Sequence, residues 1–203
     1  MRLYISPGSP YARIVRILII EKKLSEKVEV IAAKTRTTDS PYYQINPSGR
    51  VPHLVCDDGL ALEDSALICS YLDHLEGQPS FAVPAGEPGL EARRLEALVR
   101  STLDGLAVLG REKWRPVNEQ SPKIVLHETD RANRLLNLWE GQINHSMFHG
   151  KLNMVQIVFG CTLGFADLIP EFPWRPAHPK LNSWFEAMSA RPSFFETKPP
   201  APK

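Results

Sequence analysis

Serines stand at the starts of two predicted helices, where their hydroxyls can act on an anion. Ser9 precedes Pro10, and residues 11–23 (YARIVRILIIEKK) follow with apolar side chains at helical spacing. Ser65 follows Asp64 and begins a second helical pattern. The unpaired N–H groups and the dipole of a helix start favour an anion, to which a hydroxyl can also donate a hydrogen bond. Each serine therefore has two candidate roles, which are capping its helix and binding a ligand.

A helix start that carries a hydroxyl is suited to activating a substrate thiol. A free thiol has a pKa of about 8.5 and is mostly protonated at neutral pH, although the thiolate is the nucleophile. The helix dipole contributes about 0.3 to 1 kcal/mol and a charge-assisted hydrogen bond about 1.5 to 3 kcal/mol. Together they lower a thiol pKa by about one to three units, which makes the thiolate the main form.

The stretch between these helices predicts a turn followed by a β-hairpin. Asn-Pro and Ser-Gly pairs open residues 46–64, and two short apolar runs flank residues 57–59. Pro52 has no N–H group, so we expect it at the first position of a strand or at a sheet edge. The peptide bond between Val51 and Pro52 is also a candidate for the cis form.

The first part of the chain predicts a small α/β domain. Residues 1–6 and 28–32 are typical of strands and flank the first helix, which makes a βαβ unit with parallel strands. A short helix is predicted after Ser40, in a polar segment. The hairpin then adds two antiparallel strands before the second helix.

Beyond this domain the sequence predicts helices alone. Residues 77–89 are rich in proline and glycine, as expected of a linker. The segment 153–169 is apolar nearly all round and is typical of the central helix of a bundle. The other predicted helices span residues 90–111, 122 to about 145, and 180–190, before a proline-rich tail. We therefore predict domains at residues 1–76 and 90–203, joined by the linker.

Composition excludes several classes of function. The chain has 203 residues with 24 basic and 23 acidic side chains, so it has no electrostatic footprint for nucleic acid. No apolar run approaches the roughly 18 residues of a membrane span, and no signal peptide precedes the first strand, so we expect a cytoplasmic protein. The three cysteines lie in apolar patterns and predict buried thiols, with no metal site.

The order of these pieces resembles the N-terminal domain of a cytosolic glutathione S-transferase. The matching segments are SPGSPYARIVRIL, NPSGRVPHL and LEDSALICSYL. Residues 152–168 and 184–194 are similar to the buried helix and the C-terminal signature of that family. The resemblance implies an α/β plus all-α protein, with a thioredoxin-like domain (βαβ-α-ββα) followed by a helical bundle. In the family the buried helix opens with Ser or Thr and, three residues later, Asp; here Asn153 and Gln156 stand there and can still cap it.

The resemblance assigns Ser9 to the sulfur of glutathione. In serine-type members of this family the hydroxyl at the first helix start contacts that sulfur. Ser6 and Tyr11 lie close by and are alternatives, whereas strand alternation more readily buries Tyr4. Relatives with cysteine at this position act as thiol oxidoreductases, but serine cannot form a mixed disulfide.

The same resemblance assigns the remaining glutathione contacts in the first domain. The helix start at Ser65 is expected to hold the γ-glutamyl carboxylate, with Asp64 facing the γ-glutamyl amine and Glu63 as the alternative acid. Val51, beside Pro52, is expected to offer its backbone to the cysteinyl part, as an added strand does.

Further expected contacts lie outside these segments. Arg50 is a candidate for the glycyl carboxylate, although it can equally be a solvated loop charge, and Lys34 is assigned to glutathione by a weaker match. A small hydrophobic electrophile is expected between the domains, against Tyr11, Leu106 and Trp114.

The leading hypothesis is a glutathione transferase that uses glutathione as co-substrate and no metal. The family implies a homodimer. Two alternatives stay open: another glutathione-dependent activity (isomerase, dehalogenase or peroxidase), and a non-catalytic interaction module such as the stringent starvation proteins, because a fold does not guarantee an activity.

Overall fold

The structure is a computed structural model that describes residues 1–75 and 80–200. The chain forms two compact units, and the first consists of Met1–Ala82 together with Pro192–Pro200. The second unit includes Val83–Arg191. Part of the predicted linker, at residues 77–79, and the predicted domain end at residue 76 lie outside the described residues. The exact domain boundaries stay a prediction.

A four-stranded mixed sheet forms the centre of the first unit, in the order β2-β1-β3-β4. β1 runs parallel to β2 and antiparallel to β3, and β3 is antiparallel to β4. The strands are β1 (Arg2–Ile5), β2 (Glu29–Ala32), β3 (His53–Val55) and β4 (Ala61–Glu63). Leu3 and Leu54 pair across β1 and β3 and are both fully buried. The predicted βαβ unit and hairpin are confirmed.

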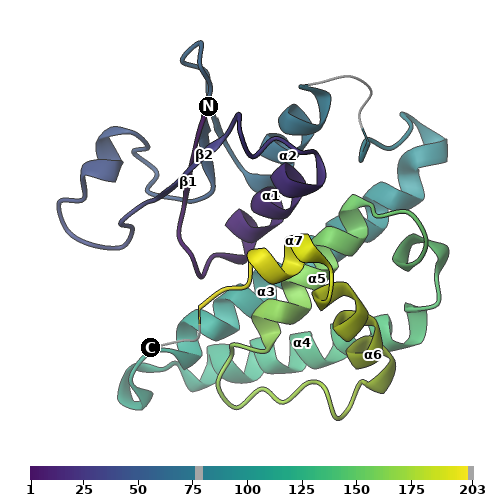
Figure 1. The fold of residues 1–203 in the computed structure, drawn as a ribbon. Coiled ribbons are helices and arrows are strands. Elements are labelled where there is room, and N and C mark those ends of the chain that lie inside the picture. Colours follow the sequence, from purple (N-terminus) through teal and green to yellow (C-terminus); the bar gives the residue numbers. More distant parts are fainter. Residues whose placement is uncertain (76–79, 201–203) are drawn as a thin grey trace. The chain divides into compact units, whose positions relative to one another are not determined.

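Two longer helices pack against each other in the first unit, α1 (Pro10–Glu21) and α2 (Ser65–His74) (Figure 1). α1 buries an apolar stripe at helical spacing, in which Ile14, Ile17 and Leu18 have no exposed surface. The predicted short helix is the 3₁₀ turn η1 (Pro41–Gln44), and Ser40 caps it.

A short helix near the C-terminus is a correction to the sequence analysis. The proline-rich tail was expected after the last helix, but Pro192–Glu196 forms α7, which packs on α1. Pro192 suits a first helical position. Buried Arg13 and Glu21 of α1 both form hydrogen bonds with α7, and no local pattern in the sequence points to this pairing.

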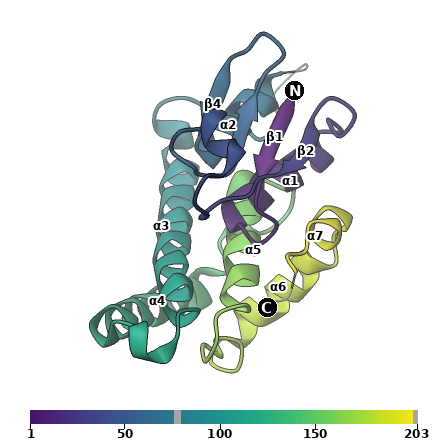
Figure 2. The same ribbon diagram turned by 90° about the vertical axis from the view of Figure 1, so that its left-hand side faces the viewer.

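The second unit is all-helical. Its helices are α3 (Leu90–Lys113), α4 (Pro122–Gln142), α5 (Met154–Ala166) and α6 (Pro179–Ser189), with short 3₁₀ turns η2 (Glu87–Gly89), η3 (Val117–Glu119) and η4 (Ser146–Phe148). α5 is buried from Val155 to Ala166 and runs beside α3 (Figure 2). α5 is therefore the predicted central helix of the bundle.

The start of α5 has the capping arrangement expected of Asn153 and Gln156. The side chain of Asn153 accepts the backbone N–H of Gln156 at 3.1 Å, and the Gln156 side chain accepts the backbone N–H of Asn153 at 3.0 Å. Two orphan N–H groups of the helix start are thereby satisfied, without the Asp of the family pattern.

The cysteines are buried, as predicted for Cys56, Cys69 and Cys161. Among the residues that the structure describes, no helix combines the length and the apolar character needed to cross a bilayer.

Candidate functional site

One end of the sheet gathers the residues predicted to bind glutathione. β1 leads out of the sheet toward Ser9, and β3, which is antiparallel, enters the sheet from Pro52 at that same end. β4 runs back antiparallel to β3, so Asp64 also follows at this end. β2 is parallel to β1 and leaves toward Lys34. The strand directions therefore bring together segments that are far apart in sequence.

Ser9 is the N-cap of α1. Its Oγ accepts the backbone N–H of Ala12 at 3.3 Å, and its own N–H donates to the carbonyl of Ser6 at 2.9 Å. The side chain is half-buried, and Pro10 occupies the first helical position. Capping uses only a lone pair of the hydroxyl, so its proton is left for another acceptor. Tyr4 is buried, with 6% of its surface exposed, as expected for a weak candidate.

The loop before β3 ends at Val51 and Pro52, which together are called the proline edge. The Val51–Pro52 peptide bond is cis. Val51 is half-buried and Pro52 is buried. In the turn that precedes them Gly49 has φ of +65°, a backbone conformation that L side chains rarely adopt.

Asp64 lies directly before α2, and its backbone is strained, with φ of +82°. Its Oδ1 accepts the N–H groups of Ala66 at 2.7 Å and Leu67 at 3.2 Å, so it is the N-cap. Ser65 follows and is 3% exposed. A non-glycine residue held at positive φ is a recurrent feature of functional sites.

The remaining predicted contacts are on the surface of the same unit. Lys34 and Arg50 are exposed, and Tyr11 in the first turn of α1 is half-buried. The carbonyl of Lys34 accepts a hydrogen bond from the Ser40 hydroxyl at 2.5 Å. The roles of these three residues stay predictions.

The two other residues proposed for the electrophile belong to the helical unit. Leu106 in α3 is fully buried. Trp114 follows α3, is 41% exposed, and packs edge-on against Phe165 with ring centroids 5.6 Å apart. Its indole N–H donates to the carbonyl of Leu168 at 3.3 Å. The electrophile site stays a prediction.

A hydrogen-bonded cluster around Glu63 was not found from the sequence. Its Oε2 accepts from Nδ2 of Asn46 at 2.7 Å and from the hydroxyl of Ser48. These bonds from Ser48 and Asn46 lower the pKa of the Glu63 carboxyl below its ordinary value. The Asn-Pro-Ser sequence predicts a turn, but it does not indicate which distant acid bonds to that turn.

His53 lies directly behind the proline edge. It is 5% exposed, and its ring lies 6.4 Å from each of the rings of Tyr4 and Tyr42. Neither ring nitrogen has a hydrogen-bond partner within the described part of the chain. Burial lowers the pKa of His53, and the carboxylate of Glu63 opposes that shift. The neutral form of His53 is therefore favoured in the folded protein.

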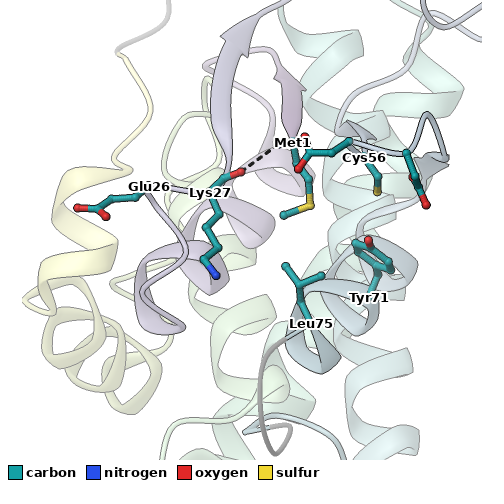
Figure 3. A pocket seen from close by; sticks show the side chains of 8 residues that line it. Met1, Glu26, Lys27, Cys56, Tyr71 and Leu75 are labelled. Atoms are coloured by element: carbon teal, nitrogen blue, oxygen red, sulfur yellow. Dashed lines mark hydrogen bonds and ion pairs between the residues drawn. The ribbon is translucent and has the colours of Figure 1, made fainter.

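A surface hollow of about 620 Å³ lies at the opposite end of the sheet. In Figure 3 Tyr71 and Leu75 project from the α2 side toward Met1 and Cys56. The amino group of Met1 donates to the carbonyl of Lys27 at 3.0 Å. A hydrogen bond with Cys56, together with burial, raises the pKa of Tyr71 to about 12. This hollow is distinct from the end that carries Ser9.

No group of three or more His, Cys, Asp or Glu side chains within residues 1–75 and 80–200 is arranged to hold a metal ion.

The sheet, its two helices and the separate helical unit define a thioredoxin-like domain followed by an all-α domain. Residues 3–80 match the glutathione S-transferase N-terminal domain family, and residues 122–187 match the glutathione S-transferase C-terminal domain family. The chain therefore belongs to the glutathione S-transferase family.

Known relatives and solved structures match nearly the whole length of this chain. An uncharacterised GST-like protein of Escherichia coli, YibF, is 30% identical over 202 residues, covering 98% of this chain and 99% of the relative. A glutathione transferase family member from Pseudomonas fluorescens, solved with bound glutathione, has 29% identity and a TM-score of 0.86 over 98% of each chain. A glutathione S-transferase from Methylobacillus flagellatus, also with glutathione bound, has 28% identity and a TM-score of 0.86 over 98% of this chain and 99% of that one.

Proposed function

We propose that the protein is a glutathione transferase in which Ser9 stabilises the thiolate of bound glutathione. The observation that carries the proposal is the position of the Ser9 hydroxyl, which caps α1 through its lone pair and keeps its proton to donate. The relatives from P. fluorescens and M. flagellatus support glutathione as the ligand, because both were solved with it bound.

The chemistry proceeds from the ionised sulfur. The Ser9 O–H donates to the sulfur while the dipole of α1 favours its negative charge, so glutathione loses its thiol proton near neutral pH. The thiolate then attacks an electrophilic carbon and forms a carbon–sulfur bond, and the electron pair released at the electrophile leaves with a leaving group or is protonated by solvent.

The other predicted residues bind the tripeptide. In this proposal the start of α2 at Ser65 holds the γ-glutamyl carboxylate, and Asp64 faces the γ-glutamyl amine. Val51 pairs with the cysteinyl backbone, and Arg50 and Lys34 attract the glycyl carboxylate. We assign the γ-glutamyl amine to Asp64 and not to Glu63, because the Glu63 carboxylate is already bonded to Asn46 and Ser48.

The electrophile, the location and the oligomeric state are proposed from the family. We propose that a small hydrophobic electrophile binds beside Tyr11 or Trp114, without the fully buried Leu106, and we expect a cytoplasmic homodimer. Light scattering of the purified protein measures its oligomeric state.

Retention on immobilised glutathione, followed by turnover with a panel of electrophiles, tests the proposal. A transferase is retained, is eluted by free glutathione, and consumes glutathione with at least one electrophile. A protein that washes through the column is a non-catalytic module, and the proposal is then wrong.

A further inference from the structure

The Glu63 carboxylate is placed to hold the turn that precedes the proline edge. In the pairing of β3 with β4, Glu63 lies opposite His53, the residue after Pro52. Its Oε2 accepts one hydrogen bond from Asn46 Nδ2 at 2.7 Å and another from the Ser48 hydroxyl. Hydrogen bonds to an ionised acceptor are stronger than those between neutral groups.

Both groups that Glu63 holds are bonded in turn to the backbone of Arg50. Nδ2 of Asn46 also donates to the Arg50 carbonyl at 3.1 Å, and the hydroxyl of Ser48 accepts the Arg50 N–H at 3.2 Å. The Tyr42 hydroxyl donates to the same carbonyl at 2.5 Å. The peptide units on either side of Arg50 are thus oriented by side chains that meet at one carboxylate.

We propose that Glu63 is a positioning residue for the glutathione site, acting through Asn46 and Ser48 on the backbone from Arg50 to Val51. The inference rests on the proposed function, because it concerns the edge that receives the cysteinyl part of glutathione. An added strand binds through one N–H and one C=O whose placement must hold within about 0.5 Å. A turn that has lost its carboxylate anchor samples other positions, and binding then has to order it again.

The inference separates the two neighbouring acids by role. Asp64 caps α2 through Oδ1 and stands at the helix start, where it acts on the ligand itself. Glu63 touches no ligand and acts on glutathione only through the turn. Its removal should therefore weaken glutathione binding while leaving the chemical step at Ser9 intact.

Calorimetric titration of glutathione into the full chain tests this directly. We expect Glu63→Ala to raise the glutathione Kd about tenfold, with kcat at saturating glutathione within about twofold of the parent. Glu63→Gln should lose less, because its amide oxygen still accepts from Asn46 and Ser48. Glu29→Gln, at an exposed position of β2 in the same sheet, is the matched control and should leave the Kd unchanged.

A double-mutant cycle separates positioning from general stability. Ser48→Ala removes one arm of the cluster from an exposed position, so Ser48→Ala and Glu63→Gln together should raise the Kd by less than the product of their single effects. All titrations are made well below the unfolding midpoint of each variant, where a purely structural loss leaves the Kd of the folded protein unchanged. An unchanged glutathione Kd in folded Glu63→Ala overturns the inference, and so does an unchanged Kd in the folded double variant that combines Glu63→Gln with Ser48→Ala. Failure of the parent protein to bind glutathione instead overturns the proposed function.

Discussion

Arg13 in α1 donates a hydrogen bond to the backbone carbonyl of Phe194, 181 positions further along the chain, at 3.0 Å. Its guanidinium also lies over the Phe194 ring, 5.5 Å from the centroid, and Nε reaches the Thr197 hydroxyl at 3.4 Å. The Arg13 side chain is buried, with 6% of its surface exposed. The end of the chain is therefore part of the first unit, and it is attached to the helix that begins at Ser9.

Loss of Arg13 should destabilise the protein through this contact. Arg13→Ala removes the charged donor of the buried Phe194 carbonyl, which keeps only the long hydrogen bond from the Thr197 hydroxyl at 3.5 Å, so we expect the free energy of unfolding to fall by about 2 to 3 kcal/mol in urea denaturation. Arg2→Ala, at an exposed strand position, is the control and should change little. Equal stabilities for the two variants would contradict the role of Arg13.

Substitutions at Ser9 can separate its capping role from its chemical role. Aspartate caps a helix as well as serine does, so Ser9→Asp should keep the stability of the parent, whereas Ser9→Ala should lose about 1 kcal/mol. Neither alanine nor an ionised aspartate has a hydrogen to donate to the sulfur, so turnover with glutathione should fall about 10- to 100-fold in both variants.

The neighbouring hydroxyls provide the comparison for Ser9. Ser6→Ala and Tyr11→Phe should keep most of the turnover, measured with the same electrophile. Full activity in Ser9→Ala or Ser9→Asp, or loss of activity in Ser6→Ala instead, would transfer the chemical role away from Ser9.

Asp73 should be essential for the stability of the first unit. Its carboxylate accepts the N–H groups of Ser80, Phe81 and Ala82, each at 2.9 Å, and it is paired with Lys22 at 3.2 Å. Asp73→Ala leaves the buried Lys22 charge without its counter-ion, with the carbonyl of residue 73 at 2.9 Å as its remaining acceptor, and leaves three N–H groups without the carboxylate, so we expect a loss of about 3 kcal/mol or more.

The pH dependence of the same carboxyl has a definite sign. Burial raises the pKa of Asp73, but hydrogen bonds from Phe81 and Ser80 and the charge of Lys22 outweigh it, so the pKa lies below its ordinary value of 3.8. A lowered pKa stabilises the folded state above the ordinary value and loses that effect as the pH falls through the folded-state pKa. The acid denaturation curve should therefore flatten below about pH 4 in Asp73→Asn relative to the parent. An unaltered curve would argue against the carboxylate as the source.

His53 should make the protein less stable under mildly acid conditions. Burial beside Tyr4 and Tyr42 lowers the pKa of His53 from its ordinary value of 6.5, and the Glu63 carboxylate opposes that shift only in part. The unfolded chain then binds a proton before the folded one, so stability falls as the pH drops below 6.5 toward the folded-state pKa. His53→Phe keeps a ring but cannot titrate, and the difference between its urea midpoints at about pH 5.5 and 7.5 should be smaller than in the parent.

An exposed histidine provides the control for this measurement. The His127 side chain is 70% exposed, so His127→Gln should keep the pH dependence of the parent. If His53→Phe behaves in the same way as His127→Gln, His53 is not the titrating group.

Local signals in the sequence were sufficient for the elements that carry the candidate site. Serine before proline predicted the start of α1 at Pro10, and the Asp-Ser pair predicted the start of α2 at Ser65. The capping of α5 by Asn153 and Gln156 was expected from the family resemblance together with the capping preferences of these two residue types. Each of these features depends on residues within about four positions of one another, which is the range over which capping and helical spacing operate.

Only the tertiary structure decided which distant groups meet. The pairing of β3 with β4 brings Glu63 to the turn at Asn46 and Ser48, and the packing of α7 on α1 places Arg13 against Phe194. Such partners follow from strand register and from the burial of whole helix faces, so no local spacing encodes them. The sequence by itself thus determined where the helices begin and which residue types stand there, whereas the fold determined which side chains hold the proposed site in place.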